Sequence, residues 1–172
     1  KTLCALSYIN HLKISKVLVV STKTAIQSTW VDEIKTHTDF LYTSLLGTKS
    51  QKIKNLYFGL RKSRVDAHYY NTEKKNIVCF LLNFDGVENI FNELIQANFD
   101  FIIVDESTKI KSPDTKRTKV LWKLAESISK RCIMTGFPVT ENISDFYSQI
   151  KFLDLGETFG KSWYAFMGRY FT

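Results

Sequence analysis

Two adjacent carboxylates, Asp105 and Glu106, directly follow an apolar run at residues 99–104. Continuous apolar runs of this length are typical of strands that are covered on both faces. Side chains just after such a strand face the ligand crevice of an open parallel sheet. There, an aspartate can hold Mg²⁺ and a neighbouring glutamate can orient and deprotonate a water. Two acids can also simply end a strand, so the pair alone leaves both interpretations open.

Lys1 and Thr2 lead directly into a helical stretch at residues 3–12. This pair matches the end of the phosphate-binding motif GxxxxGK[ST], in which the lysine reaches the β and γ phosphates and the hydroxyl binds Mg²⁺. The glycines of that motif are not in the sequence. The pair is informative because of its position in the sequence. A strand, a second crossover and the carboxylates follow it in the order that a nucleotide-driven motor requires. We therefore expect ATP and Mg²⁺ as cofactors.

The elements that would position these residues are short apolar strands separated by helices. Four runs rich in β-branched or aromatic residues predict buried strands at 16–21, 76–83, 99–104 and 131–135. Apolar stripes with helical spacing predict helices around 26–34, 87–95 and 120–128, the first capped by Thr22 or Thr24. Residues 53–60 predict another helix, followed by a polar surface segment through residue 76. Alternating strands and helices favour one doubly wound α/β domain with a mainly parallel sheet and helices on both faces.

The composition favours a protein that binds a polyanion. The 172 residues carry a formal net charge of +7, and the lysines and arginines recur in clusters at 49–64 and 109–119. Such a surface suits nucleic acid, although a merely solvated lysine-rich face is the alternative. The three cysteines and three histidines are isolated, which indicates neither a disulfide framework nor a zinc site. No apolar run has membrane-spanning length, so we expect a soluble, intracellular protein without a membrane partner.

A segment near the C-terminus resembles a known family. The sequence MTGFP at 134–138 follows the last predicted strand, and Asn142, Asp145, Gln149 and FLDLG at 152–156 come after it. This pattern resembles the LTGTP segment of Snf2-type members of helicase superfamily 2, including the Snf2-like helicases of bacteriophages. Segments 19–34, 76–87 and 111–119 match the family in the expected order. The resemblance covers essentially the whole chain and implies a RecA-like lobe of the P-loop NTPase type.

The resemblance also implies roles for single residues. It makes Lys1 the phosphate lysine, Thr2 an Mg²⁺ ligand, Asp105 a metal ligand through water and Glu106 the catalytic base. Thr135 and Gly136 would couple the ATP state to the grip on DNA, although they could also form only a turn that ends a strand.

Further residues would contact nucleic acid if the resemblance holds. The candidates for the DNA backbone, approached without reading sequence, are Ser21, Thr22, Lys23 and Asn83. Further electrostatic candidates are Lys111, Lys116 and Arg117. Asn83 could instead cap a helix. For Trp30 we favour packing on the sheet over stacking on a base, and for the C-terminal aromatic cluster we favour core contacts with a second lobe.

Two residues depart from the family pattern. Thr108 stands where many relatives have histidine, and Phe137 replaces the second threonine of LTGTP. We expect residues 1–172 to be the first ATP-binding lobe, truncated before its phosphate-loop glycines and without the second RecA-like lobe, and inactive in isolation. The predicted whole is an ATP-dependent DNA helicase or translocase acting on double-stranded DNA. The alternatives are a restriction-system motor subunit, a superfamily 2 RNA helicase, or a non-catalytic nucleic-acid-binding fragment.

Overall fold

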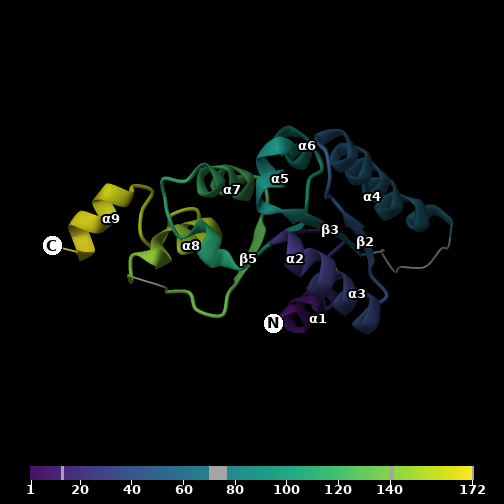
Figure 1. Ribbon diagram of the computed structural model, residues 1–172, viewed down its shortest axis with the longest axis horizontal. Coiled ribbons are helices and arrows are strands. Elements are labelled where there is room, and N and C mark those ends of the chain that lie inside the picture. The colour runs from purple at the N-terminus through teal and green to yellow at the C-terminus, as the bar shows by residue number, and fades with distance from the viewer. Residues whose placement is uncertain (13, 70–76, 140–141, 172) are drawn as a thin grey trace.

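A five-stranded parallel sheet organises the chain (Figure 1). The computed structural model describes residues 1–12, 14–69, 77–139 and 142–171. The strands are β1 (Lys16–Ser21), β2 (Leu41–Ser44), β3 (Val78–Asn83), β4 (Phe101–Asp105) and β5 (Lys130–Met134). Their order is β2-β3-β1-β4-β5, and every neighbouring pair is parallel. The predicted doubly wound α/β fold is confirmed.

Helices cover both faces of the sheet, as the alternation of side chains along each strand requires. On one face, Val17 and Val19 of β1 pack in a core with α1 (Thr2–Leu12) and α3 (Val31–His37). On the other face, Leu18 and Val20 pack in a second core. The helices on this second side are α4 (Lys49–Tyr69), α5 (Phe84–Asn89), α6 (Phe91–Gln96) and α7 (Lys116–Glu126). Both faces of β1 are therefore dry, which explains its unbroken apolar sequence.

The helical segment after β1 is wound in three parts. Thr22 caps it, because its hydroxyl accepts the backbone N–H of Ala25 at 3.2 Å. The segment comprises α2 (Lys23–Ala25), a π-helical turn η1 (Ile26–Trp30) and α3. π-helical turns are rare and are often found at functional sites. Here the turn ends at Trp30, whose side chain is fully buried.

The structure departs from the sequence-based expectations in its helices and in its sheet. The helix predicted around 87–95 is divided into α5 and α6, because Ile90 leaves the helical conformation at φ −129° and ψ 33°. Helix α4 is longer than predicted at both ends, and residues 70–76 of the predicted polar segment lie outside the described residues. Strand β2 was not predicted. It has only four residues, all half-buried, at the edge of the sheet.

The C-terminal part adds two helices, α8 (Asp145–Asp154) and α9 (Trp163–Tyr170). The aromatic side chains of this region pack against one another within this chain. Phe166 is buried, and its ring centroid lies 4.9 Å from that of Tyr147 on α8. Tyr164 faces solvent, with 83% of its surface exposed. Helix α9 lies at the end of the molecule opposite α4 (Figure 1).

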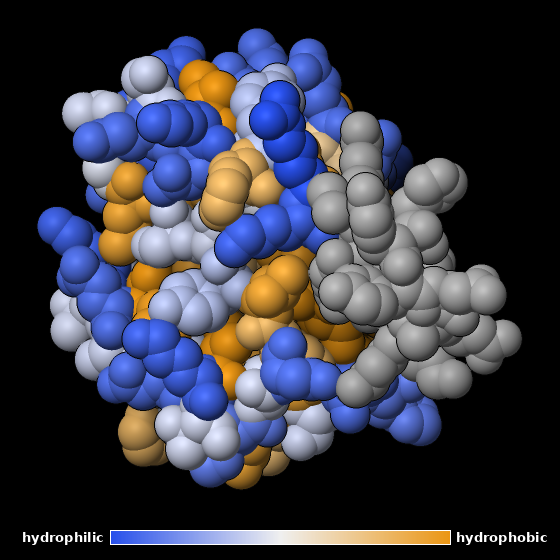
Figure 2. Space-filling model, turned by 90° about the vertical axis from the view of Figure 1, so that its right-hand side faces the viewer, coloured by the Kyte–Doolittle hydropathy of each residue, from blue (hydrophilic) through white to orange (hydrophobic). Residues whose placement is uncertain are grey.

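The surface shown in Figure 2 is largely polar, and the three cysteines are separate from one another. Figure 2 looks onto the end of the molecule where α4 lies and shows mainly hydrophilic residues, with smaller hydrophobic areas between them. No helix among the described residues has the length and hydropathy that a bilayer crossing requires. Cys4, Cys79 and Cys132 are free thiols. Burial raises the pKa of Cys79 to about 12, so this thiol is a protonated core side chain.

Candidate functional site

The candidate residues lie at one edge of the sheet because all five strands are parallel. In the strand register, Ser21 at the end of β1 pairs with Asn83 at the end of β3. Asp105 at the end of β4 pairs with Met134 at the end of β5. The residues that follow these strands are therefore brought together at the carboxyl edge, where open α/β sheets bind ligands.

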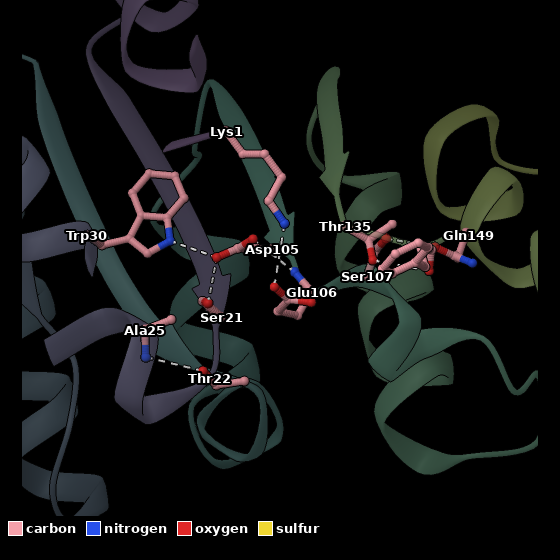
Figure 3. Close-up of polar contacts among 11 residues, drawn as sticks. Lys1, Ser21, Thr22, Ala25, Trp30, Asp105, Glu106, Ser107, Thr135 and Gln149 are labelled. Carbon is pink, nitrogen blue, oxygen red and sulfur yellow. Dashed lines mark hydrogen bonds and ion pairs between the residues drawn. The ribbon is translucent and has the colours of Figure 1, made fainter. Parts of the chain in front are cut away.

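Asp105 is buried and held by three hydrogen bonds (Figure 3). Its Oδ2 accepts the hydroxyl of Ser21 at 2.9 Å and the indole N–H of Trp30 at 3.0 Å. Its Oδ1 accepts the backbone N–H of Glu106 at 3.0 Å. The donors come from β1, the π-helical turn and the residue after β4, so the orientation of the carboxylate is fixed. Oδ1 retains acceptor capacity for a further ligand.

Glu106 turns away from the strand in an uncommon backbone conformation. Its φ of 53° and ψ of 52° lie in the left-handed region. Residues other than glycine rarely adopt this backbone conformation, and they keep it when the surrounding structure holds them there. The short 3₁₀ helix η2 (Ser107–Ile110) starts immediately afterwards. The Glu106 carboxylate is partly exposed, and its Oε1 lies 3.7 Å from Nζ of Lys1. The two residues predicted to act on one substrate therefore lie together.

Lys1 links the start of α1 to two loops of the sheet edge. Its carbonyl accepts the N–H of Ala5 at 3.1 Å, so it immediately precedes the helix. A Cβ added to Gly136 would meet Nζ of Lys1 at 3.9 Å, which places the lysine between Glu106 and the segment after β5. An ammonium group beside a helix N-terminus is an environment that suits phosphate. Thr2 is buried in the first turn of α1.

The residues present fit Mg²⁺ bound together with a phosphate ligand. In the described part of the chain, no group of three or more His, Cys, Asp or Glu side chains could hold a metal ion alone. Mg²⁺ commonly needs only one or two carboxylates, because water and substrate phosphates complete its coordination. Asp105, with remaining acceptor capacity at Oδ1, is the side chain that would contribute here, and the predicted contribution of the Thr2 hydroxyl stays a prediction.

The predicted coupling residues follow β5 beside this edge. Thr135 is half-buried and its hydroxyl donates to the carbonyl of Phe137 at 3.4 Å, while Gly136 is exposed. Gln149, which belongs to the segment that resembles the family but was given no role from the sequence, is fully buried on α8 and contacts this loop through Pro138. Its signal in the sequence was a polar residue among the apolar positions of a helix, between Tyr147 and Phe152.

The residues predicted to contact the DNA backbone differ in how exposed they are. Lys23 is exposed at the start of α2, and Thr22 and Asn83 are half-buried at the same edge of the sheet. Asn83 occupies the N-cap position of α5, as the alternative interpretation expected, but its side chain makes no capping hydrogen bond. Ser21 is a correction: it is fully buried and its hydroxyl donates to Asp105, so it is not at the surface to meet a phosphate.

The further basic candidates all have carboxylate partners. Lys111 lies 3.6 Å from Asp145. Lys116 pairs with Glu88 on α5. Arg117 donates to Asp85 at 3.0 Å and lies over the ring of Phe84, 5.3 Å from its centroid. These pairs join α7 and the loop before it to α5 and α8, so any contact of these cations with DNA would compete with an existing ion pair.

Known proteins with similar sequences include a phage protein and a DNA annealing helicase and endonuclease. The chain is 30% identical to putative protein p41 of Acyrthosiphon pisum secondary endosymbiont phage 1, over 99% of this chain and 36% of that protein. It is 26% identical to the bovine DNA annealing helicase and endonuclease ZRANB3, over 63% of this chain and 10% of that protein. The chain thus spans about a third of the phage relative and a tenth of the bovine one.

A solved structure shares the fold of this chain, and a family model matches nearly all of its sequence. The SWI2/SNF2 ATPase core of Sulfolobus solfataricus, solved in complex with double-stranded DNA, superposes with a TM-score of 0.73. That match covers 98% of this chain and 31% of the other, at 19% identity, and it shows a shared fold. The model of the SNF2-related domain matches residues 1–168. The chain belongs to the SNF2-related domain family.

Proposed function

We propose that this chain is the ATP-binding lobe of an enzyme that couples ATP hydrolysis to movement on double-stranded DNA. The observation that carries the proposal is the pairing of Lys1 with Glu106 at 3.7 Å, beside an Asp105 that is fixed by Ser21 and Trp30. Lys1 and the two carboxylates come from two motifs that lie more than 100 residues apart in the sequence. Their convergence at the carboxyl edge of a parallel sheet is what a nucleotide hydrolase of this family needs.

Each of these side chains has one task in the proposed reaction. The ammonium of Lys1 and the first amides of α1 bind phosphate oxygens, while Thr2 and Asp105 hold Mg²⁺. Bound Mg²⁺ would neutralise charge on the phosphates during transfer. Glu106 orients the attacking water and accepts its proton. Ser21 and Trp30 keep the carboxylate of Asp105 in place by donating to Oδ2.

DNA would lie along the same edge of the sheet. The exposed Lys23 and the polar side chains of Thr22 and Asn83 are available there to contact phosphates without reading sequence. The net charge of +7 favours such a partner. Lys111, Lys116 and Arg117 remain candidates that would exchange their carboxylate partners for DNA phosphates. Thr135 and Gly136, in the loop after β5 that approaches Lys1, would transmit the state of the nucleotide, and a second RecA-like lobe would complete the site.

The test is ATP hydrolysis by the full-length protein with and without double-stranded DNA. We expect hydrolysis that DNA stimulates, and we expect Glu106→Gln to lower kcat by roughly 10²- to 10⁴-fold while ATP still binds. Glu157→Gln, at an exposed position before α9, is the matched control and should leave kcat unchanged. Turnover that survived Glu106→Gln would refute the assignment of the base. DNA affinity with no nucleotide effect would instead favour the non-catalytic binding module.

A further inference from the structure

The amide of Gln149 connects three separate segments of the chain. Its Oε1 accepts the hydroxyl of Ser107 at 2.6 Å. Its Nε2 donates to the carbonyl of Pro138 at 2.7 Å and to the carbonyl of Asp145 at 2.9 Å. Gln149 and Ser107 are both fully buried. The oxygen and both N–H groups of the amide are therefore used, in a place where water does not compete.

Two of the connected segments belong to the candidate site. Ser107 follows Glu106 directly and starts η2, while Pro138 comes two residues after Gly136 in the loop beyond β5. In Figure 3, Ser107 and Gln149 point toward one another beside Thr135. Asp145, the third contact, is the first residue of α8. The side chain of Gln149 therefore ties the loop that bears the glutamate to the loop that bears Thr135 and Gly136.

The hydrogen bonds of Gln149 matter for Glu106 because of the backbone conformation of that residue. A non-glycine residue in the left-handed region stays there only when its neighbours over-determine it. The backbone N–H of Glu106 is held by Asp105 Oδ1 on one side, and the next residue, Ser107, is held by Gln149 on the other. If the bond to Gln149 were lost, Ser107 would be released and the left-handed turn that directs the Glu106 side chain would lose one of its supports.

We propose that Gln149 is a positioning residue, which sets Glu106 against the 135–138 loop and makes the two move together. The inference rests on the function proposed above, because it matters only if Glu106 acts on a bound nucleotide. Both connections run through one buried amide, so a displacement of either loop must be followed by the other or must break a hydrogen bond in the interior. Breaking such a bond is costly.

The test uses the full-length protein and separates positioning from simple stability. Gln149→Leu removes all three hydrogen bonds, and Ser107→Ala removes only the one to the Glu106 loop. We expect Gln149→Leu to lower DNA-stimulated kcat by about tenfold and to leave the KM for ATP within about twofold. Ser107→Ala should lower kcat in the same way but less. The double variant should lose little more than Gln149→Leu alone, because both changes break one connection.

Trp122→Phe is the structural control. The indole N–H of Trp122 donates to the carbonyl of Ser148 at 3.0 Å, so this change loosens α8 without touching the Gln149 amide. We expect it to lower the melting temperature but not DNA-stimulated kcat. Equal losses of kcat in Trp122→Phe and Gln149→Leu would overturn the positioning role. If Gln149→Leu does not fold, Ser107→Ala decides, and an unchanged kcat in that variant overturns the inference.

The proposed function and this inference fail in different ways. A wild-type protein with no ATP hydrolysis would overturn the proposed function and the positioning role with it. A wild-type protein with DNA-stimulated hydrolysis, together with variants at 107 and 149 that keep its kcat, would overturn the positioning role alone.

Discussion

The indole N–H of Trp30 donates a hydrogen bond of 3.0 Å to Oδ2 of Asp105. Trp30 is the last residue of a π-helical turn, 75 positions away from the carboxylate in sequence, and it is fully buried. A hydrogen bond from a neutral donor to a carboxylate is stronger than one between neutral groups. The turn therefore places a core tryptophan so that its one polar atom serves the candidate site.

A double-mutant cycle with Trp30→Phe and Asp105→Ala measures this contact. Each single variant also leaves space in the interior, but the cycle isolates the pairwise term from the cavity terms. We expect a coupling free energy of about 1.5–3 kcal/mol, the range for hydrogen bonds to charged groups, from urea unfolding of the four proteins. A coupling energy near zero would mean that the indole contributes only packing.

Ser21 and Lys23 lie two residues apart and should respond differently to substitution. Lys23→Ala removes an exposed ammonium, so it should weaken DNA binding and reduce the slope of log K against log salt by about 1. Ser21→Ala removes a buried donor to Asp105, so the salt dependence should stay unchanged while ATP turnover falls. Binding titrations at several salt concentrations, with turnover measured in parallel, check both. A reduced salt slope in Ser21→Ala would restore the contact with DNA predicted from the sequence.

The parts of the fold that the sequence predicted are those in which local pattern and burial agree. Strand β1 is apolar because both of its faces are covered, and it begins and ends where predicted. Strand β2 has four half-buried residues at an edge, and such a segment has no continuous apolar run to identify it. The interruption at Ile90 was also invisible, because its neighbours keep helical spacing on both sides of the break.

Within the candidate site, residue types were predictable but partners were not. Asp105 and Glu106 could be placed at the end of a strand from the apolar run before them. The hydroxyl of Ser21 lies 84 positions from Asp105 in sequence, and that of Ser107 lies 42 positions from Gln149. Contacts over such separations depend on strand order and on how α8 packs, which a motif does not encode. The hydroxyl of Ser21 finds its acceptor because β4, which ends at Asp105, is a direct neighbour of β1 in the sheet.

Gly59 allows α4 to approach the sheet, and its replacement should be costly. A Cβ at this position would come within 2.6 Å of Phe80 Cε1 and 2.7 Å of Thr43 Cγ2. We expect Gly59→Ala to lower the free energy of unfolding by about 1–3 kcal/mol, because overpacking outweighs the gain in helix propensity. Gly168→Ala in α9 is the control: its Cβ would meet nothing within 4 Å, so it should stabilise the chain by about 0.5–1 kcal/mol. Urea unfolding measures both, and a stabilised Gly59→Ala would contradict the close approach.

Asp154 should make the stability of the C-terminal part depend on pH. Burial would raise the pKa of its carboxyl, but hydrogen bonds from Thr158 and Gly156 outweigh this effect and hold the pKa below its ordinary value. Oδ1 accepts the N–H of Gly156 and Oδ2 that of Thr158, each at 2.8 Å, just after α8 ends at the left-handed Leu155. The ionised form is thus favoured by folding. Its stabilisation is complete above the ordinary value of 3.8 and is lost as the pH falls through the lower pKa of the folded state.

Asp154→Asn tests this dependence, because an amide cannot carry the charge and offers only one oxygen to the two N–H donors. We expect the variant to lose about 1–2 kcal/mol of unfolding free energy at pH 7, and the difference from wild type to shrink below pH 3.8. Asp114→Asn is the control: its carboxylate is 81% exposed and pairs with Lys119 at 3.7 Å, so it should cost no more than about 0.5 kcal/mol at pH 7. If the loss in Asp154→Asn were the same at pH 7 and at acid pH, the turn would depend on the shape of the side chain. A loss confined to the higher pH would show that it depends on the charge.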